Sequence, residues 1–158
     1  MSAVREAAAG DIVVNRARGE MVSHSETAIH VREFAPVVSD EPPSRGGTNK
    51  GPSPLEYVLV SLCACTNVSP ARMAEKLRFA YSGLETFAEG ELDTRGRKGT
   101  ATVPVHYRAV RMRIEIATEE PDRRLDRLAD LVSRHCPVDS LIQAAVPDYT
   151  VTWVRKPS

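Results

Sequence analysis

The chain has 158 residues, and its 21 basic and 21 acidic side chains give a formal net charge of zero at pH 7. This length is enough for one domain with a real hydrophobic core. The balanced charge and the lack of any Lys/Arg block argue against a nucleic acid or an anionic membrane surface as partner. We therefore expect a single domain over residues 1–158 whose partners are small molecules or proteins.

The N-terminal segment does not resemble a secretion signal, because Arg5, Glu6 and Asp11 interrupt it. No stretch approaches the ~18 apolar residues of a membrane-spanning helix. The three cysteines are too few for a disulfide framework. These features predict a cytoplasmic protein with buried or redox-active thiols, and we expect residues 1–10 to be frayed.

Residues 11–34 predict a small antiparallel sheet. Residues 11–15 and 20–24 have the composition of strands joined by a turn at 16–19, and alternation over 27–34 predicts a third strand. Residues 35–52 then collect prolines and glycines, which predicts a loop of about eighteen residues. Loops of this length are commonly functional or mobile.

The chain is organised around an apolar segment that begins at Ser53. Ser53 stands at an N-cap position, Pro54 at the first helical position, and Glu56 completes a capping box. Glu56 is the only charged residue between Ser53 and Cys65, so we expect a helix that is buried on nearly all sides. Pro70 lacks a backbone donor and crowds the preceding turn, which predicts a kink or a restart of the helix there.

Two further strands are predicted over residues 84–93 and 103–117, around a turn at 95–99. In the second strand the apolar residues at positions 110, 112, 114 and 116 alternate with charged ones, so one face of this sheet should be solvated.

Two helices and a closing strand complete the predicted order. Pro121 begins a helix that ends before Pro137, and Asp139 or Ser140 caps a short helix through Ala145. Residues 150–154 predict the closing strand. This mixture of segregated strands and helices predicts an α+β fold.

The cysteines do not form a metal-binding pattern. Cys63 and Cys65 are two positions apart, about 200° around a helix, so they point to opposite sides and cannot share a metal. No Cys/His spacing matches a structural zinc site, and we expect neither a metal nor a cofactor. Cys65 and Cys136 each lie near a proline that interrupts a helix. A buried cysteine is commonly a small hydrophobe, so each is either a core residue or a reactive thiol.

The sequence resembles the OsmC/Ohr superfamily of osmotically induced and organic-hydroperoxide-resistance proteins. The resemblance covers about residues 11–156 and rests on residues 47–56 (GTNKGPSPLE), 64–66 (ACT), 72–76 (RMAEK) and 135–138 (HCPV). It implies an OsmC-like fold, in which an antiparallel sheet packs on a long buried cysteine-bearing helix. It also implies a homodimer of two intertwined chains.

Enzymes of this superfamily are cysteine peroxidases, so the resemblance implies roles for particular residues. Cys65 matches the peroxidatic position and Cys136 the resolving position. The arginine and glutamate of the family site fall on Arg45 and Glu56, with Arg18 as the alternative arginine. The implied function is a thiol-dependent peroxidase that reduces organic hydroperoxides and is reset by a dithiol reductant, lipoyl-type or other.

The chemistry of a peroxide explains these residue types. A thiolate attacks the O–O bond, and a guanidinium stabilises that thiolate because it stays charged even when partly desolvated. The resulting sulfenic acid condenses with a second thiol to a disulfide. Asp139 replaces a serine that often follows the family's second cysteine motif, and we expect its negative charge to raise the pKa of Cys136.

Two questions stay open at this point. Nine positions separate Glu56 from Cys65, which is about half a turn out of alignment, so the two cannot meet on one straight helix. Either the helix start bends, or Glu56 reaches the thiol of the other subunit in a homodimer. The alternative function is a non-catalytic OsmC-like protein that binds a small hydrophobic ligand in the dimer cleft.

Overall fold

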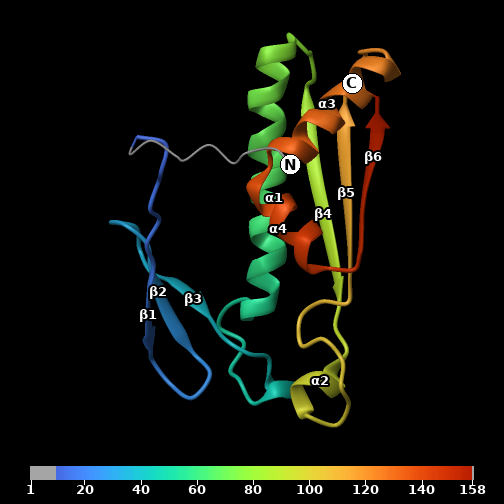
Figure 1. The fold of residues 1–158 in the computed structure, drawn as a ribbon. Helices are drawn as coiled ribbons and strands as arrows, with labels where there is room; N and C mark the ends of the chain where they lie inside the picture. The colour runs from blue at the N-terminus through green and yellow to red at the C-terminus, as the bar shows by residue number, and fades with distance from the viewer. Residues whose placement is uncertain (1–9, 158) are drawn as a thin grey trace. The chain divides into compact units, whose positions relative to one another are not determined.

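The computed structural model describes residues 10–157 and contains two compact units, Met1–Pro54 and Leu55–Ser158, which we describe one at a time (Figure 1). Apart from Gly10, the segment expected to be frayed lies outside the described residues. Within residues 10–157, no helix is both long enough and apolar enough to cross a membrane.

The N-terminal unit contains an antiparallel sheet of three short strands in the order β1-β2-β3. The strands are β1 (Arg18–Met21), β2 (Thr27–His30) and β3 (Val37–Ser39).

The predicted three-stranded meander is confirmed, but its predicted positions are partly wrong. The chain turns at residues 22–26, where Val22 N–H donates to the Glu26 carbonyl at 2.9 Å, and Met21 pairs with Thr27. Arg18 therefore lies in a strand and not in a turn, and residues 11–15 have no strand to pair with. The third strand of the sheet falls inside the expected loop.

The rest of the loop predicted over residues 35–52 includes a short 3-10 helix, η1 (Pro43–Arg45). Hydrogen bonds to the Asp40 side chain fix the path of this loop. The Asp40 side chain is fully buried and accepts five hydrogen bonds. The chain must approach itself closely here, because a Cβ at Gly47 would overlap the carbonyl oxygen of Glu41. The donors to Asp40 are the Ser25 hydroxyl, the Glu41 N–H, the Thr48 N–H and hydroxyl, and the Lys50 N–H.

The C-terminal unit packs helices against a second three-stranded sheet in the order β4-β5-β6. Its elements are α1 (Pro54–Leu77), β4 (Gly83–Glu91), α2 (Thr94–Lys98), β5 (Ala109–Ala117), α3 (Asp122–His135), α4 (Pro137–Ala145) and β6 (Asp148–Lys156).

This arrangement confirms the predicted α+β class, with three differences in detail. The predicted turn at 95–99 is a short helix, α2, capped by the Asp93 side chain, and β5 begins at Ala109 and not at residue 103. The closing strand β6 pairs with β5 in parallel, so the sheet is mixed and not antiparallel. Parallel pairing requires a long crossover connection, and α3 and α4 supply it.

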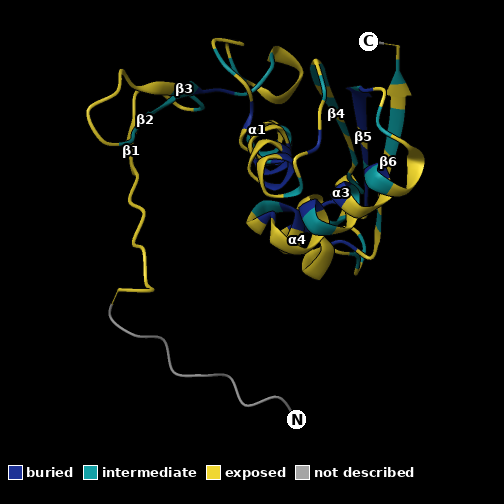
Figure 2. Cartoon of the chain, turned by 90° about the horizontal axis from the view of Figure 1, so that it is seen from above, coloured by how far each residue is buried: buried dark blue, intermediate teal, exposed yellow. Residues whose placement is uncertain are grey.

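The core of this unit lies between the sheet and the helices α1, α3 and α4, which cover one face of the sheet (Figures 1 and 2). The alternation predicted for β5 is confirmed, because its four apolar residues are all buried on this face. They pack against Leu62 of α1, Ile142 of α4 and Leu128 of α3. The four are Val110, Met112, Ile114 and Ile116.

The predicted start of the central helix is confirmed, since α1 begins at Pro54. Of the two outcomes predicted at Pro70, a kink or a restart, the restart is wrong, because the helix continues to Leu77 over 24 residues with the proline inside it. The expectation of burial on nearly all sides is not met within the single chain. The sheet covers only one side of α1, whereas Val60 and Val68 are 49% and 53% exposed.

Candidate active site

The structure brings the two proline-flanked cysteines together. The Sγ atoms of Cys65 on α1 and Cys136 lie 3.0 Å apart, with both thiols free. Cys136 is buried and Cys65 is half-buried. Pro137 fixes this position locally, because Cys136 is at once the C-cap of α3 and the N-cap of α4, and the proline takes the first position of the new helix.

The surroundings of Cys136 act on its thiol in both directions. Burial raises the pKa of Cys136, and the hydrogen bond with Cys65 raises it further. The Asp139 backbone N–H and the Ser69 hydroxyl lower the pKa of Cys136 by donating to its sulfur. The pKa of Cys136 is therefore raised, as expected, but the expected cause is wrong. Asp139 acts on the sulfur through its backbone N–H, which donates a hydrogen bond and lowers the pKa.

The Asp139 carboxylate is engaged elsewhere. It is buried and accepts hydrogen bonds from the Tyr149 hydroxyl, from Gln143 at 2.6 Å and from Ser133 at 3.5 Å. Burial and this carboxylate raise the pKa of Tyr149 well above its usual range, so Tyr149 stays a hydrogen-bond donor. The network ties α3, α4 and β6 together beside the buried thiol.

A cavity of about 380 Å³ opens beside Cys65. Its wall combines apolar side chains with one guanidinium and one imidazole, so it suits a small molecule with an apolar part and a polar group. The lining residues are Ala64, Cys65, Val68, Ser69, Arg72, Met73, His135 and Pro137.

Sequence reasoning missed two residues of this cavity, Ser69 and Arg72. The Ser69 hydroxyl lies 3.9 Å from the Cys65 sulfur, and Arg72 lines the same wall. They follow Cys65 by four and seven positions, and residues at these spacings share one face of a helix. That spacing was the available signal, and the expected restart at Pro70 obscured it.

The other sequence-predicted residues of the C-terminal unit lie away from the cavity. Cys63 points to β4, where its sulfur lies 3.9 Å from the Thr86 carbonyl, in agreement with the 200° separation from Cys65. Glu56 is exposed in the first turn of α1. Because α1 is uninterrupted, about 13.5 Å of helix rise separates Glu56 from Cys65, and the helix start has no sharp bend to bring them together.

The two candidate arginines belong to the N-terminal unit, and each already has a carboxylate partner there. Arg45 ends η1, and its Nε lies 2.5 Å from Glu41 Oε2. Arg18 in β1 pairs with Glu20 at 3.0 Å. Their roles at the thiol stay predictions. Among the described residues, no group of three His, Cys, Asp or Glu side chains is placed to hold a metal.

Comparison with known proteins adds the family. The family model described as "OsmC-like protein" matches residues 47–150. An OsmC-like protein from Mycoplasma pneumoniae has 20% sequence identity and a TM-score of 0.75, over 90% of this chain and 98% of that one. A comparison with curated protein sequences found no match.

Two other solved structures carry functional names. An organic hydroperoxide resistance protein OsmC from Legionella pneumophila has 15% identity and a TM-score of 0.67, over 90% of this chain and 98% of that one. An organic hydroperoxide resistance protein from Elizabethkingia anophelis has 11% identity and a TM-score of 0.69, over 92% and 98%. At such identities the likeness establishes the shared fold.

Proposed function

The chain belongs to the OsmC-like protein family, and we propose on that basis that it is a thiol-dependent peroxidase reducing organic hydroperoxides. Cys65 is the nucleophile and Cys136 the resolving thiol. The observation that carries the proposal is the 3.0 Å approach of the two sulfurs beside an open cavity. The names of the relatives from Legionella pneumophila and Elizabethkingia anophelis support the same reaction class.

In the first step the Cys65 thiolate attacks the terminal oxygen of the hydroperoxide. The S–O bond forms, the O–O bond breaks, and the leaving alkoxide takes a proton and departs as an alcohol. Cys65 is left as a sulfenic acid. The apolar wall formed by Ala64, Val68 and Met73 receives the organic substituent.

In the second step Cys136 attacks the sulfenic sulfur. The S–S bond forms, and the hydroxyl leaves as water with the proton of the Cys136 thiol. The short distance between the sulfurs favours this step over further oxidation of Cys65. An external dithiol, lipoyl-type or other, then reduces the disulfide, which requires a reducing compartment such as the cytoplasm.

A guanidinium is needed to stabilise the thiolate, and three arginines are candidates. Arg45 and Arg18 come from the family resemblance. Arg72 is supported by its place in the wall of the Cys65 cavity and by the absence of any hydrogen-bond or ion-pair partner within residues 10–157. Replacing each arginine singly with glutamine and measuring the peroxide rate identifies the one that acts.

We also propose that the active form is a homodimer. The exposed side of α1 presents Val60, Ala64 and Val68 at helical spacing, and such an apolar stripe supports burial by a second copy. Glu56 would then act on the partner's site. Mixing Cys65→Ser and Glu56→Ala subunits tests this, because shared sites restore activity that both parents lack, whereas exchange without recovery excludes the sharing.

The decisive experiment is consumption of cumene hydroperoxide in the presence of a dithiol. We expect turnover by the wild type and by Cys63→Ser, and none by Cys65→Ser. Peptide mapping after one equivalent of peroxide should find a Cys65–Cys136 disulfide. Equal rates for wild type and Cys65→Ser would refute the peroxidase and favour the non-catalytic ligand-binding function.

A further inference from the structure

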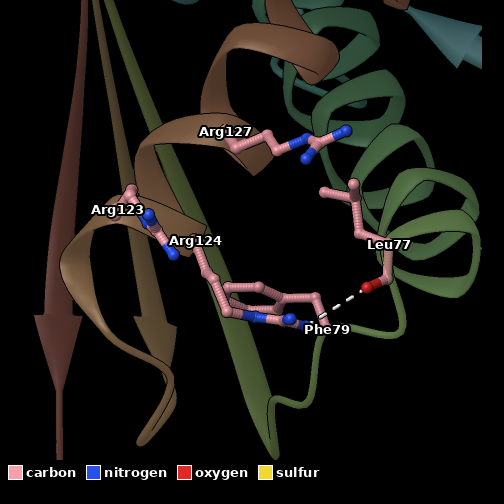
Figure 3. A pocket seen from close by; sticks show the side chains of 5 residues that line it. All are labelled: Leu77, Phe79, Arg123, Arg124 and Arg127. Carbon is pink, nitrogen blue, oxygen red and sulfur yellow. Dashed lines mark hydrogen bonds between the residues drawn. The ribbon is translucent and has the colours of Figure 1, made fainter.

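A second cavity lies at the C-terminal end of α1, and the proposed peroxidase reaction does not use it. It has a volume of about 420 Å³, within the range of small-molecule sites. Its lining includes neither Cys65 nor Cys136, and Leu77 follows Cys65 by about 18 Å of helix rise. The lining residues are Leu77, Phe79, Arg123, Arg124 and Arg127 (Figure 3).

Arg124 is a fixed part of this wall. Its guanidinium donates to the carbonyls of Leu77 and Arg78 at 3.2 and 2.7 Å and pairs with Glu120 at 2.6 Å. Figure 3 shows it extended beside Phe79. Arg124 therefore closes the end of α1, and Glu120 already balances its charge.

Arg123 and Arg127 differ from Arg124, because no carboxylate among the described residues balances their charges. They lie four positions apart in the first two turns of α3, where like charges repel each other. Neither has a hydrogen bond or an ion pair within residues 10–157. Of the acidic residues of the same helix, Asp122 pairs with Arg155 and Asp130 with Arg134, and the exposed Asp126 forms no ion pair with Arg123 or Arg127.

The base of the cavity is apolar. Phe79 is 6% exposed and belongs to the core cluster that joins α1, α3 and β5, with Leu77 packed against it. Figure 3 shows the Arg127 side chain directed toward Leu77, whereas Arg123 extends on the other side of Arg124. The Arg127 guanidinium beside this apolar base complements an anion that carries a hydrocarbon part. The positive end of the α3 dipole adds to this preference, and a guanidinium binds a carboxylate through two parallel hydrogen bonds.

From this arrangement we propose that the cavity between α1 and α3 binds a small amphipathic carboxylate, with the carboxylate on Arg127 and the hydrocarbon chain on Leu77 and Phe79, while Arg123 adds positive charge at the cavity wall. The site is separate from the thiol pair and does not depend on the proposed peroxidase activity.

The test is isothermal titration of decanoate into the full chain at low salt. We expect one binding site, whose affinity falls as salt is added because the guanidinium charges are screened. The double variant Arg123→Gln/Arg127→Gln should lose at least about tenfold in affinity, since the charge-assisted contact with Arg127 and the nearby charge of Arg123 both disappear. Acetate and inorganic phosphate, which lack a hydrocarbon chain, should bind at least about tenfold more weakly than decanoate.

Two matched variants test whether decanoate binds at this cavity and not elsewhere on the protein. Arg97→Gln/Lys98→Gln removes the same charge from exposed positions on α2, and Arg72→Gln alters the cavity beside Cys65. Both should bind decanoate like the wild type. The proposal is overturned if decanoate does not bind, if the Arg123/Arg127 variant binds normally, or if either matched variant loses as much. Phosphate binding as tight as decanoate would overturn the role of the apolar base.

Discussion

Asp40 in the N-terminal unit and Asp139 in the C-terminal unit are both buried carboxylates, but their hydrogen-bond donors belong to different kinds of structure. Asp40 accepts only from turn and loop residues, between Ser25 and Lys50. Asp139 accepts from α3, α4 and β6, between Ser133 and Tyr149.

The difference separates the ordering of a loop from the coupling of helices to a strand. The Asp40 contacts fix the path of a loop rich in glycine and proline, and they do so within one unit. The Asp139 contacts hold three elements together at the N-terminus of α4, where the Asp139 N–H also donates to Cys136. A change in the packing of α3 or β6 therefore reaches the thiol pair.

The largest expected effect comes from removing Asp40, the carboxylate that orders the loop. Asp40→Ala should increase the rate of protease cleavage within residues 41–50 by about a hundredfold or more, because five donors lose their acceptor together. Limited proteolysis followed by mass spectrometry measures this rate. Asp139→Ala is the control and should leave the loop as resistant as in the wild type; equal cleavage of both variants would show that the two regions are not independent.

Removing the other carboxylate should act on the C-terminal unit. We expect Asp139→Ala to lower the free energy of unfolding by about 2–3 kcal/mol, since the half-buried Tyr149 hydroxyl loses its acceptor and the contacts from Gln143 and Ser133 are lost with it. Urea titration followed by Trp153 fluorescence measures the loss. The exposed residue Asp130 provides the control, and Asp130→Ala should cost less than about 0.5 kcal/mol. A similar small cost for both would contradict the coupling assigned to Asp139.

The two regions should also respond oppositely to pH. The hydrogen bonds to Asp40 hold its pKa well below the usual range, so the loop order is present above about pH 4 and is lost as the pH falls below it. The pKa of Cys136 is raised, so its contribution to stability is present below about pH 8.5 and is lost as the pH rises through the raised value.

A kinetic consequence follows for the thiol pair. After one equivalent of peroxide, closure of the Cys65–Cys136 disulfide should accelerate by about tenfold per pH unit between pH 7 and 8, because the Cys136 thiolate is the attacking species. Acid quenching and thiol labelling at each pH measure the rate. A rate that levels off below pH 8 would show that Cys136 is already a thiolate there.

The smallest expected effect is that of one donor within the Asp139 network. Tyr149→Phe keeps the aromatic ring but removes the hydroxyl, and Gln143 still donates to Asp139. We expect a loss of about 1 kcal/mol in the free energy of unfolding. Thermal unfolding of the variant measures it. A loss as large as that of Asp139→Ala would mean that the tyrosine alone carries the network.

Sequence patterns predicted the elements that depend on local chemistry. Ser53 and Pro54 mark the start of α1, and the alternation through Ile114 marks the buried face of β5, because capping and side-chain periodicity act over a few residues. Sequence patterns were less reliable for strands, because a strand forms only where another segment of the chain pairs with it. Residues 11–15 look like a strand, but the hairpin closes at Met21 and Thr27 and leaves them without a partner.

The candidate site shows the same limit. The two proline-flanked cysteines were visible in the sequence, and so was the nine-residue offset of Glu56. Ser69 and Arg72 were missed because the expected break at Pro70 separated them from Cys65. The donors to Asp139 lie on three elements, and no local pattern relates Tyr149 to Asp139.

The parallel pairing of β6 with β5 sets an order for biosynthesis. A chain leaving the ribosome presents Cys65 well before β6, whose pairing with β5 anchors the far end of the crossover that carries Cys136. Until that strand is made, the crossover that holds Cys136 at 3.0 Å from Cys65 is anchored at one end only. The two thiols therefore take up their native separation late in the synthesis of the chain.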